Sequence, residues 1–200
     1  MRTLEDLHRE IRACRRCAER GFPVQPGAVV SGPMTARVMV VGQAPGRLSV
    51  QRGQPFGGPG GRTLFRWLAE AGWDEGTFRA THYFTAVTKC FPGRTPDGRG
   101  DRVPTATERE LCRPFLEQEL ALIRPALVVT LGQVAAAWFL GNGLRLEDLV
   151  GKVWMDAAGR SVLPLPHPSG RSRWLNDPAN RERLRQALVE LRRLKEEMGL

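Results

Sequence analysis

Hydrophobic positions fall into two kinds of segment along this chain. Some are short runs that are apolar on both faces, as strands buried in a parallel sheet must be; they span 37–42, 82–89 and 126–132. Others repeat with the helical period of about 3.6 residues, over 3–20, 60–72, 105–125, 133–140 and 177–199. Because strands and helices alternate, we predict an α/β fold: a three-layer α/β/α sandwich with a small, mainly parallel four-stranded central sheet.

Particular residues mark the ends of these helices. Thr3 is expected to be the N-cap of the first helix, and Asp177 followed by Pro178 marks the start of the last one. Pro114 lies inside a long helical segment and lacks a backbone donor. We therefore expect that helix to kink there or to divide into two pieces.

The segment 152–166 supplies the fourth strand. Its apolar arms are separated by Ala-Gly at 158–159, which predicts a hairpin whose second arm joins the sheet. Ligands of such sheets collect where the carboxyl ends of the strands open into loops, and these loops are 43–61, 90–105 and 167–176. We expect 1–200 to form one domain, because this length is ample for a core.

Composition adds an unusual basic charge. The chain has 30 Lys and Arg against 21 Asp and Glu, which gives a formal net charge of +9. Lysine occurs only at 89, 152 and 195, so nearly all of this charge is arginine, which suits phosphate contacts and stacking on bases. An arginine-rich solvated surface is the alternative explanation. No segment resembles a signal peptide or a membrane span, so we expect a cytoplasmic protein with no membrane partner.

Four cysteines form a second chemical signal: Cys14 and Cys17 in a C-x2-C motif, then Cys90 and Cys112. Disulfides are rare in cytoplasmic proteins, and an all-cysteine zinc site usually shows two close pairs. A [4Fe–4S] cluster takes one thiolate at each of four corners, so widely separated ligands suit it better. A redox pair or a chance spacing on a helix stays open.

The order of several short motifs resembles that of the uracil-DNA glycosylase superfamily, most nearly its iron–sulfur branches, families four and five. The motifs are the C-x2-C pair, VVGQAPG (40–46), GQPF (53–56), TAVTKC (85–90), Cys112, VVTLG (128–132) and PHPSG (166–170). The resemblance implies a monomeric DNA base-excision repair glycosylase that flips uracil out of DNA and hydrolyses its N-glycosidic bond. It also implies that all four cysteines hold the 4Fe-4S cluster.

The resemblance further implies a set of pocket residues. The GQAPG loop lines the base pocket, where small residues allow close backbone approach. Phe56 stacks on the flipped base, and His167 stabilises the negative charge that develops on O2 of the leaving uracil. The whole set is Gly42, Gln43, Ala44, Phe56, Ala86 and His167. Without the resemblance, Phe56 would be a core residue and His167 a polar residue in a proline-rich turn.

Three positions depart from these families. Gln43 stands where family four commonly has an acidic residue. Ala86 replaces an asparagine that reads uracil; family five shares the alanine and accepts more deaminated bases, so hypoxanthine and xanthine are candidate bases too. Family five's aspartate after the phenylalanine is absent, because 58–59 are Gly-Pro. For positioning the attacking water we therefore expect Asp101, with Gln43 and the more distant His82 as alternatives.

The residues after the catalytic histidine are expected to contact DNA. In the resembling enzymes this loop enters the minor groove and fills the gap left by the flipped nucleotide. Trp174 or Leu175 would be the apolar wedge, although Trp174 could equally pack on the last helix. The predicted contacts are Arg102, Ser169, Arg171, Arg173, Trp174 and Leu175.

Two other functions stay open at this point. One is a catalytically weak or inactive DNA- or RNA-binding protein that retains the base pocket, since neither family's water-activating carboxylate is evident. The other is an enzyme acting on free nucleotides. The absence of a phosphate-binding lysine loop and of a G-x-G-x-x-G motif argues against the second.

Overall fold

The sheet at the centre of the molecule has five strands rather than the four predicted. In the computed structural model, which describes residues 2–170 and 172–200, their spatial order is β2 (Tyr83–Ala86), β1 (Val38–Gly42), β3 (Leu127–Leu131), β5 (Ser161–Leu165) and β4 (Trp154–Met155). The first four are parallel. β4 is the first arm of the predicted hairpin, and it becomes a fifth strand because it pairs antiparallel with β5.

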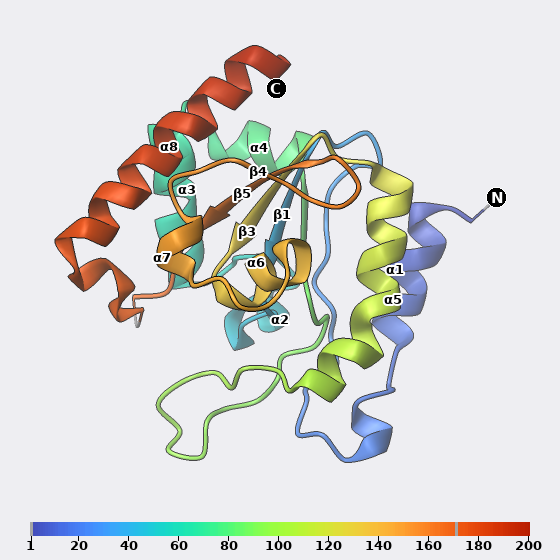
Figure 1. Cartoon of the computed structure of the whole chain (residues 1–200). Helices are drawn as coiled ribbons and strands as arrows, with labels where there is room; N and C mark the ends of the chain where they lie inside the picture. Colours follow the sequence, from blue (N-terminus) through green and yellow to red (C-terminus); the bar gives the residue numbers. More distant parts are fainter. Residues whose placement is uncertain (1, 171) are drawn as a thin grey trace.

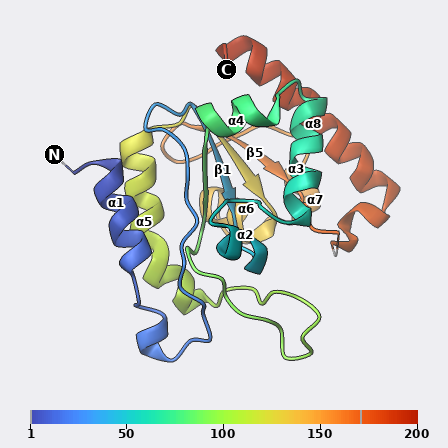
Figure 2. The ribbon, with the colours of Figure 1, turned by 180° about the vertical axis from the view of Figure 1, so that it is seen from behind.

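Helices cover both faces of this sheet, as a three-layer sandwich requires (Figures 1 and 2). One face carries α1 (Leu4–Ala13), α5 (Ala106–Ile123) and α6 (Gln133–Leu140). The other carries α3 (Pro59–Glu70), α4 (Glu75–Thr81) and α8 (Pro178–Met198). Strand residues alternate between the two layers: Phe84 packs in the α3 layer and Tyr83 in the α1 layer.

Shorter helical elements lie in the connections. They are η1 (Ala18–Arg20), α2 (Arg47–Arg52), α7 (Leu146–Leu149) and η2 (Arg173–Asn176). None of them is predicted from the sequence, and neither is α4. Segments of three to seven residues carry too little periodicity to be recognised.

The first helix is shorter than predicted. Thr3 caps it in a capping box, as expected, but the helix ends at Ala13 instead of continuing to residue 20. Arg15 Nη1 donates to two carbonyls at this end, at 2.9 and 3.0 Å, and so satisfies acceptors that the helix leaves open. Cys14 and Cys17 therefore follow the helix instead of lying on it.

Pro114 does not divide the long helix. α5 is continuous through it, and Figure 1 shows the first turns of α5 inclined to the rest, which agrees with the predicted kink. The start of α8 is also as predicted. Asp177 accepts a hydrogen bond from Ala179 N–H at 2.8 Å, and Pro178 occupies the first turn.

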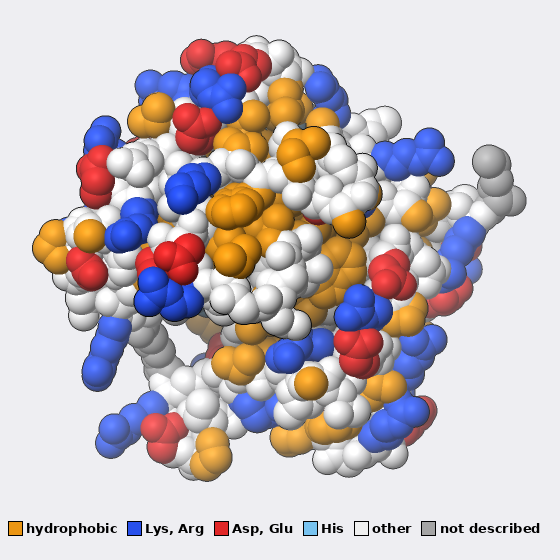
Figure 3. Space-filling view, in the orientation of Figure 1, with side chains coloured by type: hydrophobic (Ala, Val, Ile, Leu, Met, Phe, Trp, Pro, Cys, Tyr) orange, Lys and Arg blue, Asp and Glu red, His pale blue; other side chains and the backbone are white. Residues whose placement is uncertain are grey.

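Charge is distributed widely over the surface. Figure 3 shows Lys and Arg side chains across one whole face, interspersed with Asp and Glu and with apolar areas. On this face the basic charge is therefore not confined to one patch. Within the described residues, no helix has the length and apolar character needed to cross a membrane.

Candidate functional site

Three loops leave the sheet at the carboxyl end of its parallel strands, toward the lower end of Figure 1. They follow β1, β2 and β5. Gly42 at the end of β1 pairs with Ala86 at the end of β2. Gly132, after β3, donates its N–H to the carbonyl of Leu165 in β5 at 2.9 Å. The ends of four neighbouring strands thus form one edge, which we call the carboxyl edge.

Phe56 lies at the carboxyl edge in an unusual backbone conformation. Its φ is +54°, in the left-handed region that a bulky residue adopts only when its surroundings impose it. The half-buried ring is tilted against Phe84, with 5.9 Å between ring centroids. A Cβ added to Gly42 would lie 3.5 Å from Phe56 Cζ, and one added to Gly61 would lie 1.7 Å from the Phe56 carbonyl oxygen. Residue 61 must therefore be glycine.

Arg79 of α4 holds the same loop. Its Nη1 donates to the carbonyl of Pro55, the residue before Phe56, at 3.0 Å. Its guanidinium carbon lies 4.1 Å from the ring centroid of Phe65, in a cation–π contact. The loop conformation is thus fixed by a residue from another element.

His167 follows β5 and lies at the carboxyl edge beside Gly132, which follows β3. A Cβ added to Gly132 would lie 3.3 Å from His167 Cβ, and one added to Gly60 in α3 would lie 3.8 Å from the Pro168 backbone. The Ser169 N–H donates to His167 Nδ1 at 3.3 Å, which leaves the proton of the neutral ring on Nε2. Burial lowers the pKa of His167, so the ring is neutral at pH 7.

Asp101, in the loop after β2, lies close to the loop after β1. A Cβ added to Gly46, in the loop after β1, would lie 3.5 Å from Asp101 Oδ2. The charge of Asp101 also raises the pKa of His167, against the larger lowering by burial. The backbone of the exposed Asp101 pairs with Arg94 across the long loop after β2.

The other predicted pocket residues continue from the strand ends. Gln43 and Ala44 are half-buried, and the Gln43 carbonyl accepts hydrogen bonds from the Thr88 N–H and Oγ1 at 3.1 and 3.3 Å. His82 instead precedes β2, at the opposite end of that strand, where its ring centroid is 4.4 Å from that of Phe78. Asp101 and Gln43 are left as the candidates for positioning water.

Arg102, predicted to contact DNA, already has protein partners. Its two Nη atoms donate to the buried carboxylate of Glu108 at 2.7 Å each, and its Nε donates to the Pro92 carbonyl at 2.9 Å. Arg102 therefore braces the loop after β2. A DNA contact by this guanidinium stays a prediction and would have to share these bonds.

The remaining predicted DNA contacts surround η2. Trp174 and Leu175 are half-buried and pack against the core beside α8. For Trp174 this packing agrees with the alternative that it packs on the last helix. Arg173 is exposed and Ser169 is half-buried, whereas Arg171 lies outside the described residues.

All four cysteines line one pocket, which we call the cysteine pocket. Cys14 and Cys17 follow α1, Cys90 follows β2 and Cys112 lies within α5. The Lys89 N–H donates to Cys112 Sγ at 3.3 Å. Three separate parts of the chain thus bring their sulfur atoms to the same place.

The environment of the cysteine pocket raises the pKa of three of its thiols. Burial and then the neighbouring cysteines raise the pKa of Cys17 to about 11 and that of Cys90 to about 12, and burial raises the pKa of Cys112. Among the described residues, no three His, Cys, Asp or Glu side chains stand close enough to hold a metal ion between them.

Comparisons with known proteins identify the family. The profile of the Uracil DNA glycosylase superfamily matches residues 29–192. The chain belongs to this superfamily. It is 37% identical over 179 residues to the type-4 uracil-DNA glycosylase of Archaeoglobus fulgidus, covering 84% of this chain and 83% of the relative. It is 36% identical over 162 residues to the type-5 uracil-DNA glycosylase of Pyrobaculum aerophilum, covering 74% and 66%.

A solved structure supports the superfamily fold. The solution NMR structure of a candidate uracil DNA glycosylase from Methanosarcina acetivorans matches with a TM-score of 0.50 at 16% sequence identity, covering 86% of this chain and 99% of that one. At this identity the likeness concerns the fold alone. It agrees with the mainly parallel sheet described above.

Some features of this superfamily member were not predicted. Gly132 lies against His167, and Arg79 fixes the Phe56 loop. The residue types glycine and arginine do not by themselves indicate these contacts. A buried ion pair of Lys89 and Glu119 lies between the carboxyl edge and the cysteine pocket, because Lys89 contacts both Ala86 and Cys112. A signal for that pair was available, because Lys89 is a lysine in a segment that is otherwise read as a buried strand.

Proposed function

We propose that this protein is a base-excision repair glycosylase that extrudes a deaminated base from DNA and hydrolyses its N-glycosidic bond. The observation that carries the proposal is the meeting of three loops at the carboxyl edge, with Phe56 and His167 against neighbouring strand ends and Asp101 within electrostatic reach of His167. Aromatic stacking, a hydrogen-bond donor and a carboxylate are the groups that this reaction needs.

The flipped base would stack on Phe56, with Gly42, Gln43, Ala44 and Ala86 around it. Glycine and alanine at the strand ends let the backbone approach the base closely. Ala86 has only a methyl group to offer to the polar edge of the base, so it does not select uracil by an amide hydrogen bond. We propose uracil as a substrate, with hypoxanthine and xanthine as further candidates.

His167 would stabilise the leaving base. When the bond between C1′ and the base nitrogen breaks, its electron pair leaves with the base, and negative charge develops on uracil O2. The neutral ring has its proton on Nε2 because Nδ1 accepts from Ser169 N–H. A donor placed in this way stabilises the transition state by about 3–4 kcal/mol.

Asp101 would orient the attacking water. The water oxygen bonds to C1′, its proton passes to the Asp101 carboxylate, and the departed base anion takes a proton from solvent. Gln43 is the alternative, since its amide can orient water but cannot accept the proton. The charge of Asp101 near His167 would also stabilise a positive sugar at the same place.

The cysteine pocket fits a [4Fe–4S] cluster better than a single ion. Each corner of the cube takes one thiolate, so it suits four cysteines that come from three separate parts of the chain. The Lys89 N–H donated to Cys112 Sγ is the kind of outer contact that orients such ligands. The cluster would join the end of α1 to β2 and α5 as a structural element, because hydrolysis requires no electron transfer.

The DNA would lie across the carboxyl edge. Phosphates and the minor groove would be contacted by the exposed Arg173, by Ser169, by Arg171 and by the residues around η2. Because each neutralised phosphate releases counterions, affinity for DNA should fall steeply as salt concentration rises. We propose that the chain acts as a single-domain monomer.

An oligonucleotide assay tests the proposal. The protein is incubated with single- and double-stranded oligonucleotides that carry uracil, hypoxanthine or xanthine, and abasic sites are then cleaved with alkali. We expect strand breaks at one or more of these bases, and an iron content of about four per chain. Unmodified oligonucleotides are the control.

The two alternative functions give different results in this assay. A DNA- or RNA-binding protein without catalysis retards the oligonucleotides without producing breaks, whatever the base. An enzyme acting on free nucleotides does neither. Either result would overturn the proposed hydrolysis.

A further inference from the structure

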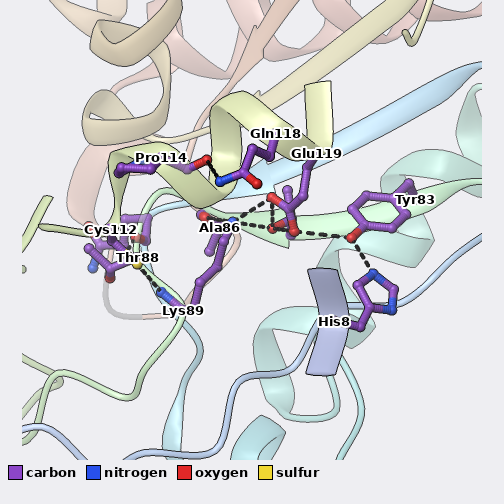
Figure 4. Close-up of polar contacts among 11 residues, drawn as sticks. His8, Tyr83, Ala86, Thr88, Lys89, Cys112, Pro114, Gln118 and Glu119 are labelled. Atoms are coloured by element: carbon purple, nitrogen blue, oxygen red, sulfur yellow. Dashed lines mark hydrogen bonds and ion pairs between the residues drawn. The ribbon is translucent and has the colours of Figure 1, made fainter. Parts of the chain in front are cut away.

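One buried ion pair is not among the residues proposed to carry out the hydrolysis. Lys89 Nζ lies 2.6 Å from Glu119 Oε2, and the side chains are only 2% and 0% exposed. Glu119 projects from α5 toward the end of β2, as Figure 4 shows. Removing two charges from water costs free energy that their attraction often fails to recover. Such a pair therefore calls for a role beyond stability.

The pair is fully hydrogen-bonded. Lys89 Nζ donates at 2.6 Å to three acceptors, Glu119 Oε2, Thr85 Oγ1 and the Ala86 carbonyl. Glu119 also accepts from Tyr83 OH at 3.0 Å and from Thr85 Oγ1 at 2.9 Å. An ammonium has three N–H groups, so every donor of Lys89 is used and its position is fixed.

Lys89 contacts both the carboxyl edge and the cysteine pocket. On one side its Nζ holds the carbonyl of Ala86, which pairs with Gly42 at the carboxyl edge. On the other side its backbone N–H donates to Cys112 Sγ, and the next residue is Cys90. Figure 4 shows that one residue, Lys89, makes both contacts.

We infer that Lys89 and Glu119 are positioning residues that fix the Ala86 end of β2 to the cysteine pocket and so link occupancy of the two sites energetically. The inference rests on the proposed function of each site. When the cysteine ligands are in place, Lys89 is held and Ala86 is held with it. By reciprocity, DNA bound at the carboxyl edge must then strengthen retention of iron in the cysteine pocket.

A variant pair separates this role from simple stabilisation. Lys89→Met with Glu119→Gln removes both charges together, leaves Tyr83 and Thr85 an amide partner, and frees the Ala86 carbonyl. The matched control is Arg160→Met with Asp156→Asn, because that partly buried pair lies in the β4–β5 turn, away from the carboxyl edge and the cysteine pocket.

The experiment measures chelator-driven loss of the visible iron–sulfur absorbance, with and without a duplex that carries one abasic site. In the unaltered protein we expect the duplex to slow iron loss by about fivefold or more, a typical coupling between sites. In the Lys89/Glu119 double variant this protection falls to less than about twofold, and kcat falls more than KM rises. The Arg160/Asp156 control keeps full protection.

Equal protection in the double variant, with unchanged kcat, would overturn the inference. So would an unaltered protein that excises bases and holds iron but gains no protection from the duplex. An unaltered protein that lacks iron or excision overturns the proposed function first, and this inference with it.

A second variant covers the case in which the double variant does not fold. Thr85→Val removes the hydroxyl that bridges Lys89 and Glu119 without changing a buried charge. We expect it to reduce the protection by about twofold or more, and unchanged protection in this folded variant would refute the linkage.

Discussion

The cysteine pocket and the carboxyl edge lie at the two ends of the same short segment, residues 86–90, yet they are built by different means. The cysteine pocket depends on side-chain chemistry, since four cysteines from three separate parts of the chain line it. The carboxyl edge depends on backbone geometry, in particular the left-handed Phe56 and the N–H that fixes the His167 ring. A site of the first kind is visible in a sequence, and one of the second kind mostly is not.

Removing one cysteine should have the largest effect. Cys112→Ala deletes the proposed ligand that lies inside α5, so the proposed cluster between α1, β2 and α5 should be lost. We expect a loss of stability on the order of 5 kcal/mol, equivalent to roughly 10–20 °C in Tm, together with loss of iron. Calorimetry and iron analysis measure both.

Val24→Ala is the control for this comparison, because Val24 lines the cysteine pocket but is not a ligand. It should keep its iron. A Cys112→Ala protein with normal Tm would show that the cysteine pocket is not a structural centre.

His167→Ala should have the next largest effect, and it should affect catalysis without unfolding the protein. Loss of a donor worth about 3–4 kcal/mol lowers kcat by roughly two to three orders of magnitude. Single-turnover excision from a uracil-containing duplex measures it. His82→Gln is the control, because His82 lies at the opposite end of β2. If both variants lose activity equally, the loss of activity reflects folding and His167 has no catalytic role.

Asp101→Asn should slow excision by about a hundredfold, the lower part of the range for general-base catalysis, while binding of an abasic duplex is unchanged. Asp97→Asn makes the same charge change in the same loop and should retain normal rates. Should the two variants behave alike, water is positioned by another group, and Gln43→Ala becomes the next variant to measure.

Lowering pH should have the smallest effect and should act on stability. Burial lowers the folded-state pKa of His8, His82 and His167, whereas the unfolded chain titrates near about 6.5. The unfolded state thus binds more protons just below this pH. The stabilisation is complete above about 6.5 and is lost as pH falls, by less than about 1.4 kcal/mol per pH unit for each histidine.

Urea unfolding between pH 7 and 5 measures this loss, in a range above the titration of most carboxylates. His82→Gln should make the slope shallower. A stability that rises toward pH 5 would mean that the histidines are better stabilised as cations in the fold.

The sequence predicted most of the fold because long elements carry strong periodicity. The strands around Val40 and Val129, the hairpin and the capped start of α8 all agree with the structure. The errors arose where tertiary contacts decide the outcome. The first helix stops before Cys14, and two residues of the hairpin's first arm become a fifth strand.

The candidate site was predicted less evenly. Residue type drew attention to the cysteines and, with the motifs, to His167 and Phe56. The contacts that orient them come from a backbone atom, the Ser169 N–H, and from Arg79, which lies outside every motif. Periodicity and residue type do not report where a carbonyl or an N–H points, so these contacts required coordinates.

The contact between the Phe56 carbonyl and Gly61 restricts how this protein could acquire a new base preference. A side chain at 61 would collide with that oxygen, and the positive φ at 56 disfavours most replacements, above all β-branched ones. Positions 43 and 86 have no such backbone constraint. A mutant library for altered specificity should therefore randomise 43 and 86 and leave 56 and 61 unchanged.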